Sequence, residues 1–134
     1  MTTEERHPFS IYIDEIERAY WECALWSSTV VLDETGAHTE PMDANYDIDD
    51  VHPATKVSHR TDIIAFVTDE ELADALDDMA PARIGHDFWL TRNHHGTGFW
   101  DRGLGAAGEL LTKAAHVYGS VDLWIDDEGK VRGA

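Results

Sequence analysis

The chain has 134 residues, of which 43% are hydrophobic, so it is long enough for a single domain (1–134) with a buried core, and global disorder is excluded. The net charge of −17, from 27 Asp and Glu against 10 Lys and Arg, repels nucleic acid and anionic membranes, so direct binding to either is disfavoured. One cysteine, Cys23, excludes an internal disulfide, and no apolar run reaches the roughly 18 residues of a membrane span.

The charge is distributed unevenly along the chain. Residues 1–80 hold 20 Asp and Glu and 4 Lys and Arg, giving −16, whereas residues 81–134 hold 7 and 6, giving −1. The first residues lack the basic-then-apolar order of a signal peptide, so we expect a cytoplasmic protein. An acidic surface attracts basic proteins, which makes a protein partner the first expectation.

The first half of the chain is predicted to be mainly helical. Residues 1–9 form a ragged end, and apolar residues at helical spacing predict a helix over about 11–26. Residues 27–45 contain turn-forming residues and are expected to be a loop, with 30–32 as a candidate short strand. Pro53 suits a helix start, and a capping-box pattern at 68–71 divides the following stretch into helices of about 54–67 and 69–79.

Acidic residues form two groups, the first before the helix predicted at 54–67 and the second within the helix predicted at 69–79. The first group raises the question of calcium, but it lacks the central Gly and closing Glu of an EF-hand loop, so a solvated acidic turn is the better interpretation. The second group covers a helix face that is either simply solvated or binds a partner. The candidate partner-binding residues are Asp47, Asp49 and Asp50 in the first group, and Asp69, Glu70, Glu71, Asp74, Asp77 and Asp78 in the second.

The most unusual stretch is 86–103, which contains four of the nine Trp and Phe residues and three of the eight His residues. Phe88, Leu90 and Arg92 alternate with Asp87, Trp89 and Thr91 at the period of two expected of a strand. Residues 93–96 resemble a turn and an aromatic pair follows, which together predict a β-hairpin. Its candidate functional residues are His86, Asp87, Trp89, Arg92, Asn93, His94, His95, Trp100, Asp101 and Arg102.

A helix over 104–118 is expected next, with Gly119 as its C-cap. Alternation at 121–125 predicts a third strand, and 130–132 a possible fourth. The predicted fold class is therefore α+β, with acidic N-terminal helices packed on a small antiparallel sheet into which one helix is inserted.

The histidines and carboxylates of the hairpin permit two chemical interpretations. His86, Asp87, His95 and Asp101 are weak candidates for a metal site, although their spacing matches no zinc signature. No nucleophile elbow or phosphate-binding loop is present, and Cys23 lies on an apolar helix face, so we expect no cofactor and favour a binding protein over an enzyme.

The remaining motif residues have structural interpretations. Arg92 and Arg102 are expected to pair with Asp87 or Asp101 and hold the strand ends in register. The two motif tryptophans either fill the core between sheet and helices or lie on an open face as anchors for a partner.

The run HDFWLTRNxHGxGFWDRG at 86–103 resembles the central motif of a group of small proteins of unassigned function from phages and other mobile elements. Residues 22–28 and 118–129 are also similar to that group, whereas 30–41 looks like an addition. The resemblance carries no catalytic assignment. It implies a phage-type acidic protein in the host cytoplasm that binds a DNA- or RNA-processing protein, as a nucleic-acid mimic or an anti-defence inhibitor.

Two alternatives remain open beside this interpretation. One is a metal-dependent enzyme that uses the His and Asp residues of the hairpin. The other is a halophilic protein whose acidity serves solubility alone, because 16 Asp residues and only 3 Lys suit a salty cytoplasm.

Overall fold

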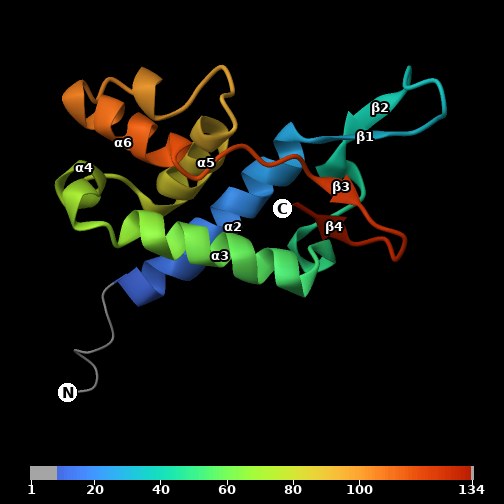
Figure 1. Cartoon of the computed structure of the whole chain (residues 1–134), viewed down its shortest axis with the longest axis horizontal. Helices are drawn as coiled ribbons and strands as arrows, with labels where there is room; N and C mark the ends of the chain where they lie inside the picture. Colours follow the sequence, from blue (N-terminus) through green and yellow to red (C-terminus); the bar gives the residue numbers. More distant parts are fainter. Residues whose placement is uncertain (1–8, 134) are drawn as a thin grey trace.

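The computed structural model of the chain describes residues 9–133. A long central helix, α2 (Phe9–Ser27), crosses the molecule, and α3 (Pro53–Val67), α5 (Pro81–Arg92) and α6 (Ala106–His116) are arranged around it (Figure 1). The short helix α4 (Ala73–Asp77) connects α3 to α5 and lies beside α6. No helix within these residues combines the length and apolar content needed to cross a bilayer.

The strands form two separate antiparallel pairs. β1 (Thr29–Val31) pairs with β2 (Thr39–Pro41) in a hairpin that extends away from the helices, and β3 (Trp124–Ile125) pairs with β4 (Val131–Arg132) (Figure 1). The α+β class is thus confirmed. The structure differs from the prediction at 27–45, where a two-stranded hairpin replaces the expected loop, and the predicted third and fourth strands pair with each other.

Four 3-10 helices complete the described chain. η1 (Met42–Ala44) and η2 (Ile48–Asp50) precede α3, η3 (Glu70–Leu72) leads into α4, and η4 (Phe99–Asp101) precedes α6. Local sequence explains the boundaries: His52 caps α3 through Nδ1 with Pro53 at its first position, and Asp69 caps η3 by accepting from Glu71 N at 2.9 Å. The predicted helices at 11–26, 54–67, 69–79 and 104–118 are confirmed to within a few residues.

The predicted β-hairpin at 86–103 is wrong, because residues 81–92 form helix α5 and residues 99–101 form η4. Asp87, Thr91 and Arg92 are the polar residues of the stretch predicted as the first strand of that hairpin. In the structure they are buried like their apolar neighbours, so the whole run 87–92 lies inside the molecule. Polarity did not indicate exposure here, because each of these side chains has a hydrogen-bonding partner within the protein.

The central contact of the fold is the crossing of α2 and α5. Gly85 lies against the backbone of α2, where a Cβ atom at this position would be 2.1 Å from the carbonyl oxygen of Ile16. The close approach brings Tyr20 and Trp89 into edge-to-face contact, with ring centroids 5.4 Å apart. Phe66 of α3 stacks on Phe88 at 4.3 Å, which ties α3 to the same core.

Candidate functional site

The motif 86–103 supplies most of the buried polar groups of the molecule. Asp87 is fully buried, and both of its carboxylate oxygens accept from Arg102, Oδ2 from Nε at 3.0 Å and Oδ1 from Nη2 at 2.8 Å. This bidentate pair joins α5 to the segment after η4. The predicted pairing of Arg102 with Asp87 is confirmed, and Asp101 lies farther from the guanidinium, at 3.8 Å.

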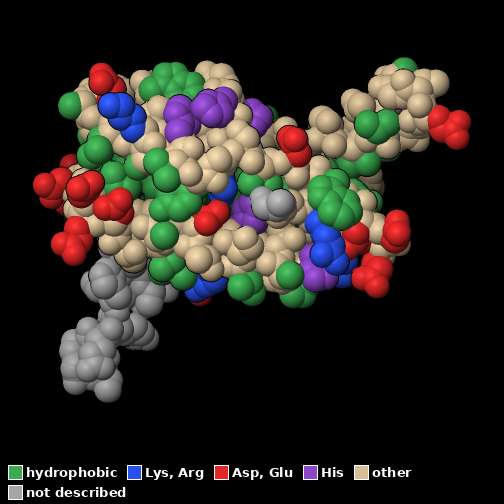
Figure 2. All heavy atoms as spheres, in the orientation of Figure 1, with side chains coloured by type: hydrophobic (Ala, Val, Ile, Leu, Met, Phe, Trp, Pro, Cys, Tyr) green, Lys and Arg blue, Asp and Glu red, His purple; other side chains and the backbone are tan. Residues whose placement is uncertain are grey.

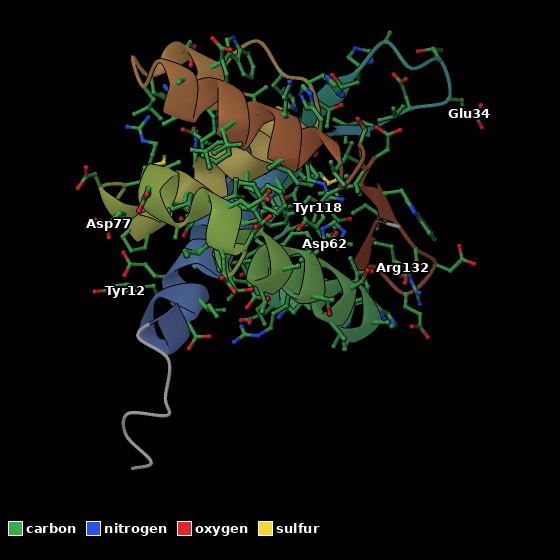
Figure 3. The ribbon with its side chains drawn as sticks, turned by 60° about the vertical axis from the view of Figure 1, so that its left-hand side comes forward. Tyr12, Glu34, Asp62, Asp77, Tyr118 and Arg132 are labelled. Carbon is green, nitrogen blue, oxygen red and sulfur yellow. The ribbon has the colours of Figure 1, made fainter. Side chains whose placement is uncertain are left out.

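Arg92 is the second buried charge of the motif. Its guanidinium donates to the carbonyl oxygens of Tyr118 and Gly119, both at 2.8 Å, to the Tyr20 hydroxyl at 3.0 Å and to Asp62 Oδ2 at 3.0 Å. The sequence predicted a pair with Asp87 or Asp101, whereas the structure pairs Arg92 with Asp62 of α3. Figure 3 shows Asp62 beside Tyr118 in the middle of the molecule. Arg92 therefore fixes the turn after α6 to α2 and α3.

Tyr20 extends this network to the C-terminal segment. Because its oxygen accepts from Arg92, its O–H donates to His59 Nδ1 at 2.6 Å, and His59 Nε2 then donates to the Gly133 carbonyl at 3.3 Å. Burial and the nearby Arg92 lower the pKa of His59, and burial raises the pKa of Tyr20, so both groups stay neutral near neutral pH.

Other motif residues also have structural partners. The indole of Trp89 is buried and donates to Ser27 Oγ at 2.8 Å, so the core interpretation holds for this tryptophan. Asn93 donates to the Trp89 carbonyl at 2.9 Å and accepts from Val121 N at 2.7 Å, which connects the end of α5 to the segment before β3. Trp100 differs, because 43% of its surface is exposed.

The predicted turn residues lie at the molecular surface. His94 adopts a positive φ of 57° and stacks on His116 of α6 with ring centroids 4.2 Å apart. His95 donates its backbone N–H to Leu90 O at 3.0 Å, and its ring lines a pocket beside Asn93. Asp101 caps η4, and a hydrogen bond from Thr97, followed by one from Gly98 N, lowers its pKa.

The structure does not bring the four metal candidates together. Arg102 occupies both oxygens of Asp87, Asp101 accepts from Thr97, and His86 and His95 line different pockets. Within residues 9–133 no three His, Cys, Asp or Glu side chains are placed to bind one metal ion.

The acidic residues of η3 and α4 form a continuous surface, here called the acidic ridge. It consists of Asp69, Glu70, Glu71, Asp74, Asp77 and Asp78. All of them are exposed except the half-buried cap Asp69, and acidic side chains gather at the edge of the molecule where Figure 1 places α4 (Figure 2). Figure 3 shows Asp77 extending from α4 into solvent.

An apolar groove of about 300 Å³ borders this ridge and is here called the α4–α6 groove. It is lined by Asp69, Glu71, Leu72, Leu110, Lys113, Ala114, Val117 and Tyr118. Val117 is 83% exposed and Leu110 40%, so large apolar side chains meet carboxylates at the same surface. Neither residue was predicted from the sequence, although their spacing of seven places them on one helix stripe outside the core face.

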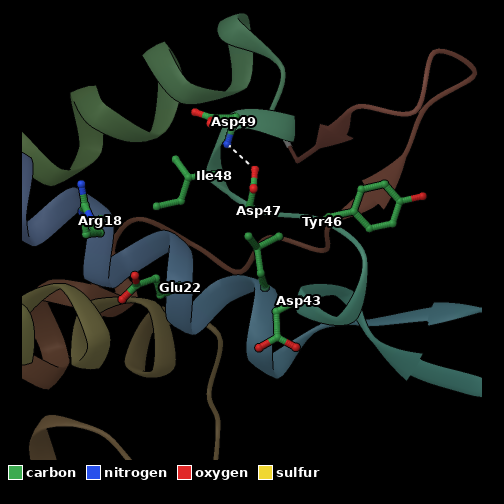
Figure 4. A pocket seen from close by; sticks show the side chains of 8 residues that line it. Arg18, Glu22, Asp43, Tyr46, Asp47, Ile48 and Asp49 are labelled. Carbon is green, nitrogen blue, oxygen red and sulfur yellow. Dashed lines mark hydrogen bonds between the residues drawn. The ribbon is translucent and has the colours of Figure 1, made fainter.

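The first acidic group, Asp47, Asp49 and Asp50, lies at the other end of α3, separated from the ridge by the length of that helix (Figure 1). Asp47 and Asp50 form a capping box on η2, and Asp49 is exposed. Together with Glu22 and Asp43, residues Asp47 and Asp49 line a pocket of about 400 Å³ that also contains Arg18 and Tyr46 (Figure 4). Asp47 and Asp50 thus have local structural roles, whereas the ridge carboxylates at 74, 77 and 78 have none among the described residues.

Comparison with known proteins returned no matching family model, no matching curated protein and no matching solved structure.

Proposed function

We propose that the chain is a non-catalytic binding protein that docks its acidic ridge and α4–α6 groove onto a basic amphipathic segment of a DNA- or RNA-processing protein. The observation that carries this proposal is the joining of exposed carboxylates to exposed apolar side chains at one surface. A ridge that only solubilised the chain would not need Val117 and Leu110 beside it.

Charge favours this kind of partner. A surface with six carboxylates in ten residues attracts cationic side chains over the distance of the Debye length, about 10 Å at 0.1 M salt. The groove then offers a place for apolar side chains at helical spacing, as in helix-in-groove recognition. A segment with Lys or Arg on one face and Leu or Ile on the other matches both parts.

Nucleic-acid-processing proteins carry surfaces of this kind, because they bind phosphates with Lys and Arg. Carboxylates on the ridge would occupy these cationic side chains in place of phosphates, which is inhibition by mimicry. The resemblance of residues 86–103 to phage and mobile-element proteins agrees with an inhibitor of host enzymes. The buried Asp87 and Arg92 are hydrogen-bonded within the protein, which supports a structural role for the motif. The acidic ridge is then the surface that remains for binding a partner.

The test uses the full chain and two matched triple variants. Asp74→Asn, Asp77→Asn and Asp78→Asn remove three charges from the ridge, and Glu34→Gln, Asp127→Asn and Glu128→Gln remove three exposed charges elsewhere, so both variants have a net charge of −14 against the original −17. Proteins captured from a host lysate are identified, purified and titrated with each variant at several salt concentrations. Capture from the lysate does not by itself support the proposal, because any acidic protein binds some basic proteins non-specifically.

The proposal expects a purified nucleic-acid-processing protein whose binding weakens with salt, is competed by its own nucleic acid, and is reduced at least about tenfold by the ridge variant but not by the control. Val117→Ser should reduce binding without changing its salt dependence, because it removes the apolar contact and leaves the charge of the surface unchanged. Equal binding by the two triple variants would show that the ridge is not the docking surface.

A further inference from the structure

A pocket of about 710 Å³ lies between α2 and α5, away from the groove at α4, and its walls carry charges of opposite sign. Arg83 of α5 and Arg102 form a cationic wall, which His86 of α5 extends as a further hydrogen-bonding side chain. Glu22 of α2 and Asp43 of η1 form an anionic wall, and Trp26 completes the lining. This arrangement is here called the α2–α5 pocket.

The cationic wall is preorganised. Arg102 uses Nε and Nη2 to bind the buried Asp87, so its guanidinium is held in one orientation and Nη1 remains as a further donor. His86 approaches Asp87 through Nδ1 at 3.5 Å, which leaves Nε2 for another contact, and 41% of its side chain is exposed. Arg83, in the first turn of α5, is exposed. Together these three side chains offer donors suited to a carboxylate or phosphate.

The two carboxylates line the same pocket from α2 and η1. Glu22 and Asp43 are both exposed, and both also line the pocket of Figure 4, so they form the boundary between the two pockets. Two carboxylates at this boundary oppose the entry of a simple anion, and so does the net charge of −17. They favour a group with donating N–H bonds or a positive charge.

Trp26 supports the same conclusion. It is 61% exposed, a large fraction for the largest apolar side chain, and it belongs to the same helical face as Cys23 and Glu22. Aromatic faces attract ammonium groups, most strongly when carboxylates lie nearby. Cys23 adds a neutral apolar surface, because burial raises the pKa of its thiol to about 12.

We infer that the α2–α5 pocket binds a small zwitterion, whose carboxylate or phosphate contacts Arg83, His86 and Arg102 and whose ammonium group lies between Trp26 and the Glu22 and Asp43 carboxylates. A ligand that carries both charges pairs with the basic and the acidic lining residues at once. Because its net charge is near zero, the acidic protein repels it little. This inference does not depend on the proposed docking function.

The test is a titration of the full ¹⁵N-labelled chain, followed by NMR, with the twenty standard amino acids, glycine betaine and phosphocholine. Acetate, inorganic phosphate and tetramethylammonium serve as probes with a single sign of charge. Three exposed lining residues are changed in turn, Arg83→Gln, Glu22→Gln and Trp26→Ala. Trp124→Ala is the matched control, because Trp124 is 52% exposed but lies on β3.

The expected result is a Kd below about 1 mM for at least one zwitterion, at least about tenfold tighter than for any single-sign probe. Arg83→Gln and Glu22→Gln should each weaken that binding about tenfold, Trp26→Ala about threefold to tenfold, and Trp124→Ala not at all. The inference is overturned if no zwitterion binds below about 1 mM, if inorganic phosphate or acetate binds equally well, or if the lining variants leave the affinity unchanged.

Discussion

Two arginines, the buried Arg92 of α5 and the partly buried Arg102 that follows η4, determine how the motif contributes to the structure. Arg92 makes four hydrogen bonds to groups that lie 26 to 72 residues away in the chain, and Arg102 binds a carboxylate with no exposed surface. Desolvating such charges is costly, and only complete hydrogen bonding offsets the cost. Losing one partner of either pair should therefore affect stability far more than losing a surface charge.

Asp87→Asn tests this expectation at a single residue. The change keeps the shape of the side chain but removes the charge that compensates Arg102, and breaking a buried pair typically costs about 3–5 kcal/mol. We expect the free energy of unfolding, measured by urea denaturation, to fall by about 3 kcal/mol, the lower end because Arg102 retains some contact with water.

The control is Asp127→Asn, which removes the same charge from an exposed turn and should change stability by less than about 0.5 kcal/mol. Equal effects of the two substitutions would mean that the Asp87–Arg102 pair does not stabilise the fold.

At the scale of elements, the crossing of α2 and α5 organises everything else. Gly85 permits the approach, and Tyr20 and Trp89 fill the space around it. Arg83 and His86, which line the α2–α5 pocket, also lie on α5. The position of this crossing therefore sets both the packing of the core and the width of the pocket.

Gly85→Ala should separate the two helices. Helix propensity favours Ala by about 1 kcal/mol, but the added Cβ would meet backbone atoms of Ile16, which cannot move aside. Overpacking of this kind costs about 1–3 kcal/mol, so we expect net destabilisation in thermal and urea unfolding. Gly96→Ala is the control, since a Cβ there meets no atom within 4 Å. A variant at Gly85 as stable as the one at Gly96 would contradict the close approach of α5 to α2.

The elements also show which parts of the fold the sequence could predict. The helices α2, α3 and α6 have apolar residues at helical spacing and local caps, so pattern alone located them. Helix α5 has no such pattern, because its polar residues Asp87 and Arg92 are buried. The sequence predicted the pair of Asp87 with Arg102, but nothing in it indicated that Arg92 binds Asp62 and Tyr20, which lie 30 and 72 residues away. Tyr20, His59 and Asp62 were missed for the same reason.

Some surface features were predictable from the sequence and others were not. The acidic ridge was predictable because runs of charged residues are seldom buried. The α4–α6 groove was not, because it depends on how α4 packs beside α6. The α2–α5 pocket likewise joins Asp43 to Arg83 across 40 positions of sequence, and no local signal relates them.

For the whole molecule, the open question is whether the charge of −17 is a functional surface or an adaptation to high salt. The structure has a closed aromatic core and a hydrogen-bonded polar interior, neither of which needs salt to form. The acidic residues repel one another. Asp74 is followed three and four positions later by Asp77 and Asp78, along and just beyond α4, and like charges at this spacing on a helix are destabilising. Salt should therefore relieve a moderate repulsion without being required for folding.

We expect the chain to be folded in 10 mM buffer and to gain about 1 kcal/mol, or about 4 °C in Tm, as sodium chloride is raised to 0.5 M. The ridge variant with Asn at 74, 77 and 78 should have a higher Tm at low salt and a smaller increase in Tm with added salt, because it lacks three of the carboxylates that repel one another. Thermal unfolding followed by circular dichroism measures both. Unfolding at low salt that only molar potassium chloride reverses would instead indicate halophilic adaptation. The charge of the acidic ridge would then no longer support its assignment as a docking surface.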